Sequence, residues 1–163
     1  MARQFILNTG FEDGMAPWTF TLGSGVVMSN AHTGTMSGQL NTTAGATEPA
    51  EVSQFVSGPF TPFSLLTFSF FAQRAAVPAT GISAVVTLFE GVNPVSTIQI
   101  LIPAAANVIP PTGSNAYEYY QQSTSDPLPL GITGALVTIS MAPDSLAAAQ
   151  LFVDDIFLVE DIL

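Results

Sequence analysis

The sequence predicts an all-β protein folded as an antiparallel β-sandwich. Apolar and polar residues alternate with a period of two, the period of a strand that buries one face. No stretch longer than two turns carries the apolar spacing of an amphipathic helix. Clusters of Gly, Pro, Asn and Asp separate the alternating stretches at short intervals, as in sandwiches and barrels.

The clearest strands are residues 64–73 and residues 134–141, in which apolar and polar residues alternate. In residues 64–73, Leu66, Phe68 and Phe70 share one face, whereas Thr67 and Ser69 share the other. The same pattern predicts further strands at residues 3–7, 17–22, 25–30, 36–41, 51–56, 82–89, 95–102, 116–123 and 150–159.

Length and composition narrow the class of protein. The 163 residues fit one domain spanning 1–163, because a chain of this size buries enough surface for a single core. Only 9% of the residues are charged, against about 25% in an average soluble domain, so the surface is unusually neutral. The net charge of −10 opposes the phosphate backbone of nucleic acids and excludes them as partners.

Membrane insertion and cysteine chemistry are also excluded. The longest apolar run, residues 63–72, is interrupted by hydroxyl side chains and is shorter than the roughly 20 residues of a spanning helix. The chain has no cysteine, which rules out disulfides, thiolate metal sites and thiol catalysis. The N-terminus has one basic residue and too short an apolar stretch for a secretory signal peptide, so none is predicted.

Both ends of the chain resemble jelly-roll carbohydrate-binding modules. Residues 7–14 (LNTGFEDG), followed by Trp18, resemble the opening of these modules. Residues 151–158 (LFVDDIFL) are similar to their final strand, and residues 31–34 (AHTG) lie where they often carry a His-Ser-Gly motif. The resemblance implies a jelly-roll arrangement of the β-sandwich.

The chain also resembles the small N-terminal jelly-roll domain of collagen-like and tandem-repeat spore-surface proteins of Gram-positive spore formers. Besides the two ends, this resemblance rests on residues 53–56, residues 117–121 and the turn 127–133 that leads into residues 135–137. It covers nearly the whole chain, although the sequence ends at Leu163 without a repeat region. It implies an extracellular structural protein at the spore or cell surface.

The carbohydrate-binding modules commonly hold a structural calcium ion, and the resemblance assigns its ligands to Glu12, the carbonyl of Gly10 and Asp154. Ca²⁺ prefers such carboxylate and carbonyl oxygens. Asp154 is preferred over Asp155 because it shares strand parity with Ile156 and is expected to point inward, where an unpaired charge is costly. In the alternative, Glu12 and Asp154 accept backbone N–H bonds at strand ends, and no cofactor is bound.

The chain is predicted not to be an enzyme. His32 is the only histidine, and no nucleophile or metal motif accompanies it. We therefore expect His32 to have a structural role in a turn. Trp18 is expected to pack in the core, with sugar stacking as the alternative.

The ligand candidates are Tyr117, Tyr119 and Tyr120. Strand alternation places Tyr117 and Tyr119 on one face and Tyr120 on the other. The alternative is that they are buried tyrosines, each with one partner for its hydroxyl.

Two functions compete. Low charge and the spore-surface resemblance favour a self-assembling filament or lattice subunit, a homo-oligomer or homopolymer in which residues 1–7 are an assembly strand. In this hypothesis Arg3 to Leu7 adds to a neighbouring subunit, and Phe5 and Leu7 fill a groove there. The plain alternative is that this segment is the first strand of its own sheet. The second function is a non-catalytic carbohydrate-binding module, with a glycan as partner and exposed aromatic and amide side chains on one sheet.

Overall fold

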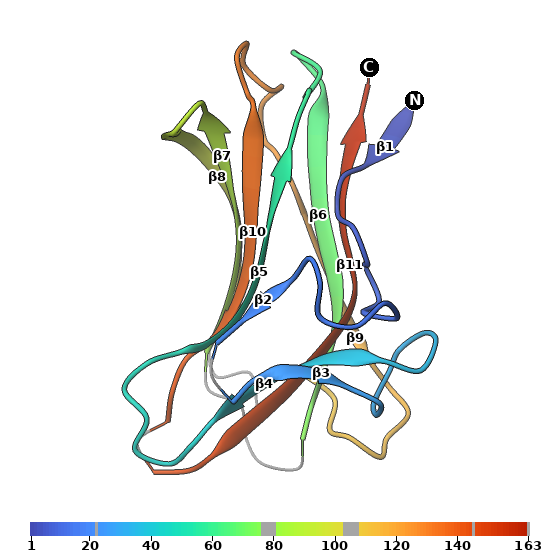
Figure 1. The fold of residues 1–163 in the computed structure, drawn as a ribbon, viewed down its shortest axis with the longest axis vertical. Coiled ribbons are helices and arrows are strands. Elements are labelled where there is room, and N and C mark those ends of the chain that lie inside the picture. Colours follow the sequence, from blue (N-terminus) through green and yellow to red (C-terminus); the bar gives the residue numbers. More distant parts are fainter. Residues whose placement is uncertain (22, 76–80, 103–107, 145, 163) are drawn as a thin grey trace.

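The structure is a computed structural model that describes residues 1–21, 23–75, 81–102, 108–144 and 146–162. Within these residues every regular element of secondary structure is a β-strand. The strands pair antiparallel in two sheets. Figure 1 shows the two sheets facing each other, with β7, β8 and β10 on one side and β6, β11 and β1 on the other. The predicted antiparallel β-sandwich is confirmed. No helix in the described part of the chain is long and apolar enough to cross a membrane.

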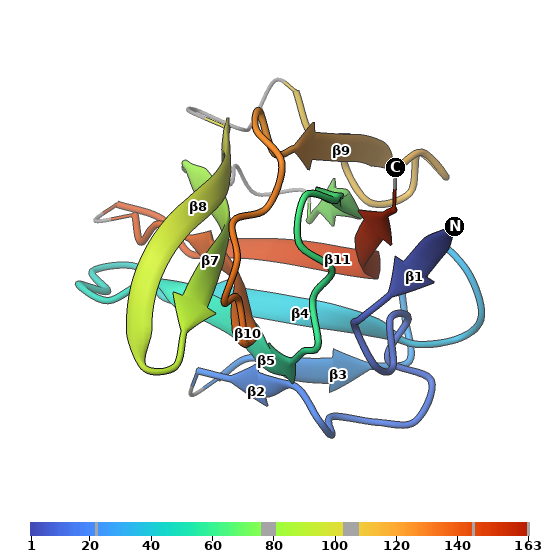
Figure 2. The same ribbon diagram turned by 90° about the horizontal axis from the view of Figure 1, so that it is seen from above.

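The six-stranded sheet has the strand order β3-β4-β11-β6-β9, and β1 also pairs with β11. Its strands are β1 (Ala2–Gln4), β3 (Gly25–Val27), β4 (Ser37–Thr42), β6 (Leu65–Arg74), β9 (Glu118–Ser123) and β11 (Ala149–Asp161). The five-stranded sheet has the order β2-β5-β10-β7-β8. Its strands are β2 (Thr19–Phe20), β5 (Ala50–Ser57), β7 (Ile82–Glu90), β8 (Asn93–Ile102) and β10 (Gly134–Met141). Figure 2 shows the same strands from above.

Three of the predicted strands are much shorter in the structure. The stretch 3–7 overlaps only β1, which ends at Gln4. The stretch 17–22 contains only β2, and its last residue lies outside the described part of the chain. The stretch 25–30 contains only β3, after which the chain leaves the sheet. Both β2 and β3 are edge strands, paired on one side only, and alternation in the sequence does not reveal how long such a pairing lasts.

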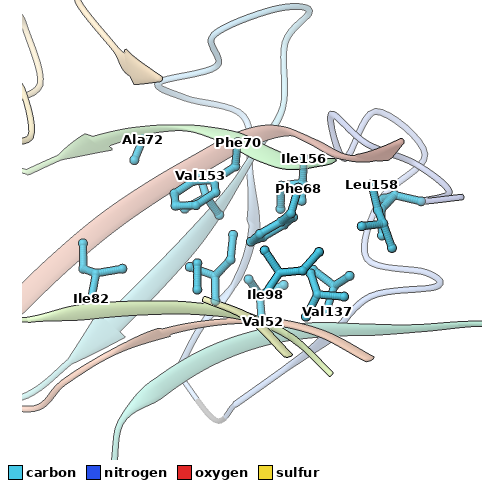
Figure 3. Close-up of a cluster of buried hydrophobic side chains, with 14 of the residues drawn as sticks. Val52, Phe68, Phe70, Ala72, Ile82, Ile98, Val137, Val153, Ile156 and Leu158 are labelled. Carbon is cyan, nitrogen blue, oxygen red and sulfur yellow. The ribbon is translucent and has the colours of Figure 1, made fainter. Parts of the chain in front are cut away.

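The core lies between the two sheets. In Figure 3, Phe68, Phe70, Val153, Ile156 and Leu158 of the six-stranded sheet face side chains of the five-stranded sheet. Those opposite them are Val52, Ile82, Ile98 and Val137. All are at least 97% buried, and full burial of such a side chain contributes roughly 1.5–3 kcal/mol. The alternation that predicted the strands therefore reflects one continuous core.

Trp18 belongs to this core, as predicted. Its side chain is 4% exposed and its ring lies 5.4 Å from that of Phe11, centroid to centroid. The indole N–H donates to the carbonyl of Asn8 over 2.8 Å, which satisfies the one polar group that the ring buries. Trp18 therefore stabilises the opening segment, and its ring is not a surface for sugar stacking.

The N-terminal segment pairs with its own sheet. Ala2, Arg3 and Gln4 lie opposite residues 159–161 of β11, and Nη2 of Arg3 lies 2.9 Å from Oε2 of Glu160. The ring of Phe5 stacks on that of Phe60 at 4.3 Å between centroids. In the single chain this segment is therefore the first strand of its own sheet, the alternative considered from the sequence.

Leu7 behaves differently, because its side chain is 64% exposed while its backbone is held. The side-chain amide of Gln54, on the inner face of β5, accepts from the N–H of Leu7 and donates to its carbonyl, both over 2.9 Å. The Gln54 side chain thus makes the two hydrogen bonds to the Leu7 backbone that a neighbouring strand would otherwise make. No observation tests the role of Arg3, Phe5 and Leu7 in assembly, and it remains a prediction.

Candidate functional site

A β-bulge in β11 shapes the surface of the six-stranded sheet. The pairing of β11 with β6 shifts register between Asp154 and Phe157, and Asp155 takes a left-handed conformation with φ of 46°. An extra residue of this kind reverses the alternation of side chains along the rest of the strand.

The bulge corrects the predicted direction of Asp154. Val153 and Ile156 both face the core, although they are three residues apart. Asp154 lies between them opposite Phe71, on the outer face of the sheet, and does not share a face with Ile156 as strand parity predicted. It is nevertheless fully buried, because the loop that contains His32 covers it.

Backbone N–H groups hold the Asp154 carboxylate. His32 and Thr33 donate to Oδ2 over 2.6 and 3.1 Å, and Asp155 donates to Oδ1 over 2.8 Å. Burial raises the pKa of Asp154 to about 6, and these hydrogen bonds oppose that rise. The carboxylate therefore ties the covering loop to β11.

Asp155 orients the histidine. Its Oδ2 lies 2.7 Å from Nδ1 of His32, and the hydroxyl of Thr33 donates to both of its oxygens. The imidazole ring stacks on Phe71 with 3.7 Å between centroids and meets the edge of Tyr117 at 5.2 Å. His32 is therefore held by contacts on two sides of its ring.

Glu12 closes the other end of the same loop. Its Oε1 accepts from the N–H groups of Thr35 and Met36 over 2.8 and 2.7 Å, and its Oε2 accepts from the Thr35 hydroxyl over 3.0 Å. The N–H bonds lower the pKa of Glu12. Gly34, at φ of 68°, lies so close to the carboxylate that a Cβ at this position would collide with it.

The predicted calcium ligands lie around this loop. A Cβ at Gly10 would stand 3.4 Å from Oδ1 of Asp154, so these two residues are neighbours, whereas Glu12 contacts the far side of the loop. The N–H bonds expected in the alternative are present at both carboxylates. Among the described residues, no three His, Cys, Asp or Glu side chains are grouped to hold a metal ion. The calcium site therefore remains a prediction.

A polar pocket of about 570 Å³ opens beside His32. It is lined by Asn30, Ala31, His32, Gln73, Gly113, Asn115 and Tyr117. The Tyr117 hydroxyl is buried and has no hydrogen-bond partner within the described chain. Burial raises its pKa, and the charges of Asp154 and Asp155 add to the rise. Of the three tyrosines predicted as ligand candidates, only Tyr117 lines this pocket.

The other two tyrosines lie on opposite faces of β9, in accordance with the predicted alternation. Tyr119 is 47% exposed, and its ring lies 4.8 Å from that of Phe71. Tyr120 faces the sandwich, 5.3 Å from the ring of Phe70, and packs against the core.

The outer face of the five-stranded sheet carries an aromatic pair that the sequence analysis missed. Phe55 is 57% exposed, and its ring lies so close above Gly134 of β10 that a Cβ there would collide with it. The ring of Phe89 is 6.1 Å away. The sequence could have revealed Phe55. Glu51 and Ser53 share its strand parity and predict a face of the strand that is exposed to solvent, where a phenylalanine is unusual.

The sequence matches no protein family model and no curated protein. The fold is similar to several solved carbohydrate-binding modules. A family 61 module in complex with β-1,4-galactotriose is 20% identical, with a TM-score of 0.60 over 96% of this chain and 97% of that one. A family 16 module is 20% identical, with a TM-score of 0.62 over 94% and 98%. The family 22 xylan-binding module from Paenibacillus barcinonensis is 18% identical, with a TM-score of 0.60 over 98% and 92%.

Enzymes share the fold as well. A Stig cyclase from Fischerella sp. TAU is 12% identical, with a TM-score of 0.64 over 99% of this chain and 98% of that one. An α-L-arabinofuranosidase is 9% identical, with a TM-score of 0.64 over 98% of this chain and 27% of the enzyme. The comparisons establish a jelly-roll β-sandwich like that of carbohydrate-binding modules and give no support to the spore-surface family. Because a fold alone does not define a function, the function is argued from the surface.

Proposed function

We propose that this chain is a non-catalytic carbohydrate-binding module that binds a glycan on the outer face of its five-stranded sheet. The observation that carries this proposal is the exposed ring of Phe55, which lies over Gly134. The similarity of the fold to carbohydrate-binding modules supports it.

The chemistry of this face suits a sugar chain. A pyranose ring has an apolar C–H face that can cover an aromatic ring and bury apolar area. Hydroxyl side chains lie on the same outer face as Phe55, where they alternate with buried core residues along β5, β10, β7 and β8. They are Ser53, Ser83, Thr87, Thr97, Thr138 and Ser140. Such groups both donate and accept hydrogen bonds, as sugar hydroxyls do.

The shape and charge of the face narrow the ligand. A sheet surface allows an extended chain to run across it, so we propose that it binds the interior of a polysaccharide. Neither Arg3 nor Arg74, the chain's two basic residues, belongs to a strand of this sheet. The proposed ligand is therefore a neutral polysaccharide, and the proposed location is extracellular, where such polymers occur.

The proposal is tested with Phe55→Ala. Binding to soluble neutral polysaccharides, among them galactan and xylan, is measured by affinity gel electrophoresis and isothermal titration calorimetry. We expect Phe55→Ala to bind about tenfold more weakly or worse, equivalent to about 1.4 kcal/mol or more. Thermal melting checks that the variant remains folded.

Phe63→Ala is the matched control, because Phe63 is 65% exposed but lies in the connection between β5 and β6. It should bind like the unmodified protein. Equal affinity of Phe55→Ala and the unmodified protein would refute this face as the binding surface. Absence of binding to every neutral polysaccharide tested would refute the function itself.

A further inference from the structure

The polar pocket beside His32 takes no part in the function proposed above. It lies on the outer face of the other sheet, between the loop at residues 30–32, Gln73 near the end of β6, and residues 113–117. Its volume of about 570 Å³ falls within the roughly 300–1,000 Å³ of small-molecule sites. Walls from three separate segments make it a pocket for one group rather than a surface for a long chain.

The lining is rich in neutral polar groups. Asn30, Gln73 and Asn115 each bring an amide, which offers two donors and one acceptor oxygen. Gln73 donates to the carbonyl of Ala116 over 2.9 Å, so its side chain is held in position. Several donors and acceptors around one cavity match a ligand that carries several hydroxyls.

Tyr117 adds a hydroxyl with no partner. It is buried, and no group in the described residues bonds to it, although a buried hydroxyl without a hydrogen bond is costly. Burial and the nearby carboxylates raise its pKa, so it stays protonated and can donate. A ligand hydroxyl that pairs with it would remove that cost.

His32 is fixed at the same pocket. Its Nδ1 faces the carboxylate of Asp155 at 2.7 Å, and its ring is stacked on Phe71. When the ring is neutral, a proton on Nδ1 leaves Nε2 as an acceptor. The pocket therefore contains acceptors as well as donors.

Charge decides which sugars fit. No arginine or lysine lines the pocket, and Asp154 and Asp155 lie directly behind it. A carboxylate or sulfate group on the ligand would meet these negative charges without a permanently charged arginine or lysine to compensate them. Acidic sugars are therefore disfavoured, and neutral sugars are not.

We infer that this pocket is a second ligand site, which takes the terminal residue of an uncharged glycan. It is separate from the Phe55 face, which receives the interior of a chain, and neither site depends on the other. The single chain would thus hold a glycan in two ways.

Tyr117→Phe tests the inference, because it removes only the unpartnered hydroxyl. Neutral trisaccharides, namely β-1,4-galactotriose, xylotriose and cellotriose, are titrated while NMR chemical shifts are followed. We expect resonances of the pocket residues to shift with at least one of them. Tyr117→Phe should weaken that binding about tenfold, while its melting temperature is unchanged or slightly higher.

Tyr120→Phe is the matched control. Its hydroxyl is also buried and has no hydrogen-bond partner among the residues that the structure describes, but it faces the opposite side of β9. It should leave the affinity unchanged, and so should Phe55→Ala. Trigalacturonate, an acidic trisaccharide, should bind at least tenfold more weakly than the best neutral trisaccharide.

Three results would overturn the inference: no shift at the pocket with any neutral trisaccharide, unchanged affinity of Tyr117→Phe, or equal binding of trigalacturonate. If Phe55→Ala abolishes polysaccharide binding and Tyr117→Phe changes nothing, the pocket is refuted and the proposed function stands. If Tyr117→Phe abolishes all binding and Phe55→Ala changes nothing, the Phe55 face is refuted and the pocket stands.

Discussion

Two fully buried carboxylates of β11, Asp154 and Glu160, are stabilised in different ways. Glu160 has an ion-pair partner in Arg3 and accepts from the hydroxyl of Ser64 over 2.9 Å and the N–H of Thr61 over 2.5 Å. Asp154 has only backbone N–H donors within the described residues. Burial accordingly raises the pKa of Asp154 to about 6. Of the two, Asp154 would gain more from an added cation.

The calcium prediction can be tested at this residue. If Ca²⁺ binds, a chelator lowers the melting temperature of the unmodified protein, and Asp154→Ala no longer responds to the chelator. Asp154→Ala should itself cost about 1–3 kcal/mol, because the N–H groups of His32 and Thr33 lose their buried acceptor. Differential scanning calorimetry with and without chelator measures both effects.

Asp126→Ala, at an exposed loop carboxylate, is the control and should keep the response of the unmodified protein. A melt of the unmodified protein that ignores the chelator would eliminate the calcium site. The hydrogen bonds of Asp154 would then be its whole role.

Residue-level features were only partly predictable from the sequence. The core position of Trp18 and the opposite faces of Tyr119 and Tyr120 follow from alternation and from the resemblance. The direction of Asp154 does not, because strand parity counted along β11 leaves out the extra residue of the β-bulge. The Tyr117 pocket joins residues from three distant segments, which alternation along one strand cannot bring together.

Among the elements, β1 has the role that differs most between the assembly hypothesis and the binding-module hypothesis. It supplies Arg3 to the buried Glu160, and the segment after it places Phe5 on Phe60 and buries Ile6 to 4% exposure. These contacts make it part of its own sandwich. Deleting Met1 to Ile6 is therefore expected to lower the melting temperature strongly or to cause aggregation, which thermal melts with light scattering would show.

Arg3→Ala is a milder variant of the same test. It leaves the carboxylate of Glu160 buried without its cation. We expect the free energy of unfolding to fall by about 1–3 kcal/mol, since the Arg3 side chain is 40% exposed.

A truncated protein that stays monomeric and melts like the full chain would contradict the deletion prediction. It would show that the fold does not need β1, so that this strand could pair with a neighbouring subunit.

Strand positions were more predictable than strand pairing. The predicted stretches 64–73 and 134–141 coincide with β6 and β10 within a residue, because both are central strands with one face in the core. Which strands become neighbours was not predictable. In the five-stranded sheet β10 lies between β5 and β7, and such distant pairings depend on the packing of the whole chain.

At the level of the whole molecule, the assembly hypothesis makes a distinct prediction. A lattice or filament subunit forms regular polymers, whereas a binding module with β1 in its own sheet is monodisperse. We expect monodisperse particles by negative-stain microscopy and a monomer mass by light scattering. Regular polymers would restore the assembly hypothesis and the assembly role of Arg3, Phe5 and Leu7. Irregular clumping would instead point to the edge strand β8, where Val95 and Leu101 are exposed.

The two ends of the chain meet. The amino group of Met1 donates to the carbonyl of Ile162 over 3.2 Å, and Figure 1 shows both termini at the same corner of the sandwich. Any sequence joined to the front of the chain and any sequence joined to its back would therefore leave from one point. A pulling force applied between those two joined segments would therefore act first on the short β1–β11 pairing. It would reach the rest of the sandwich only after that pairing had separated.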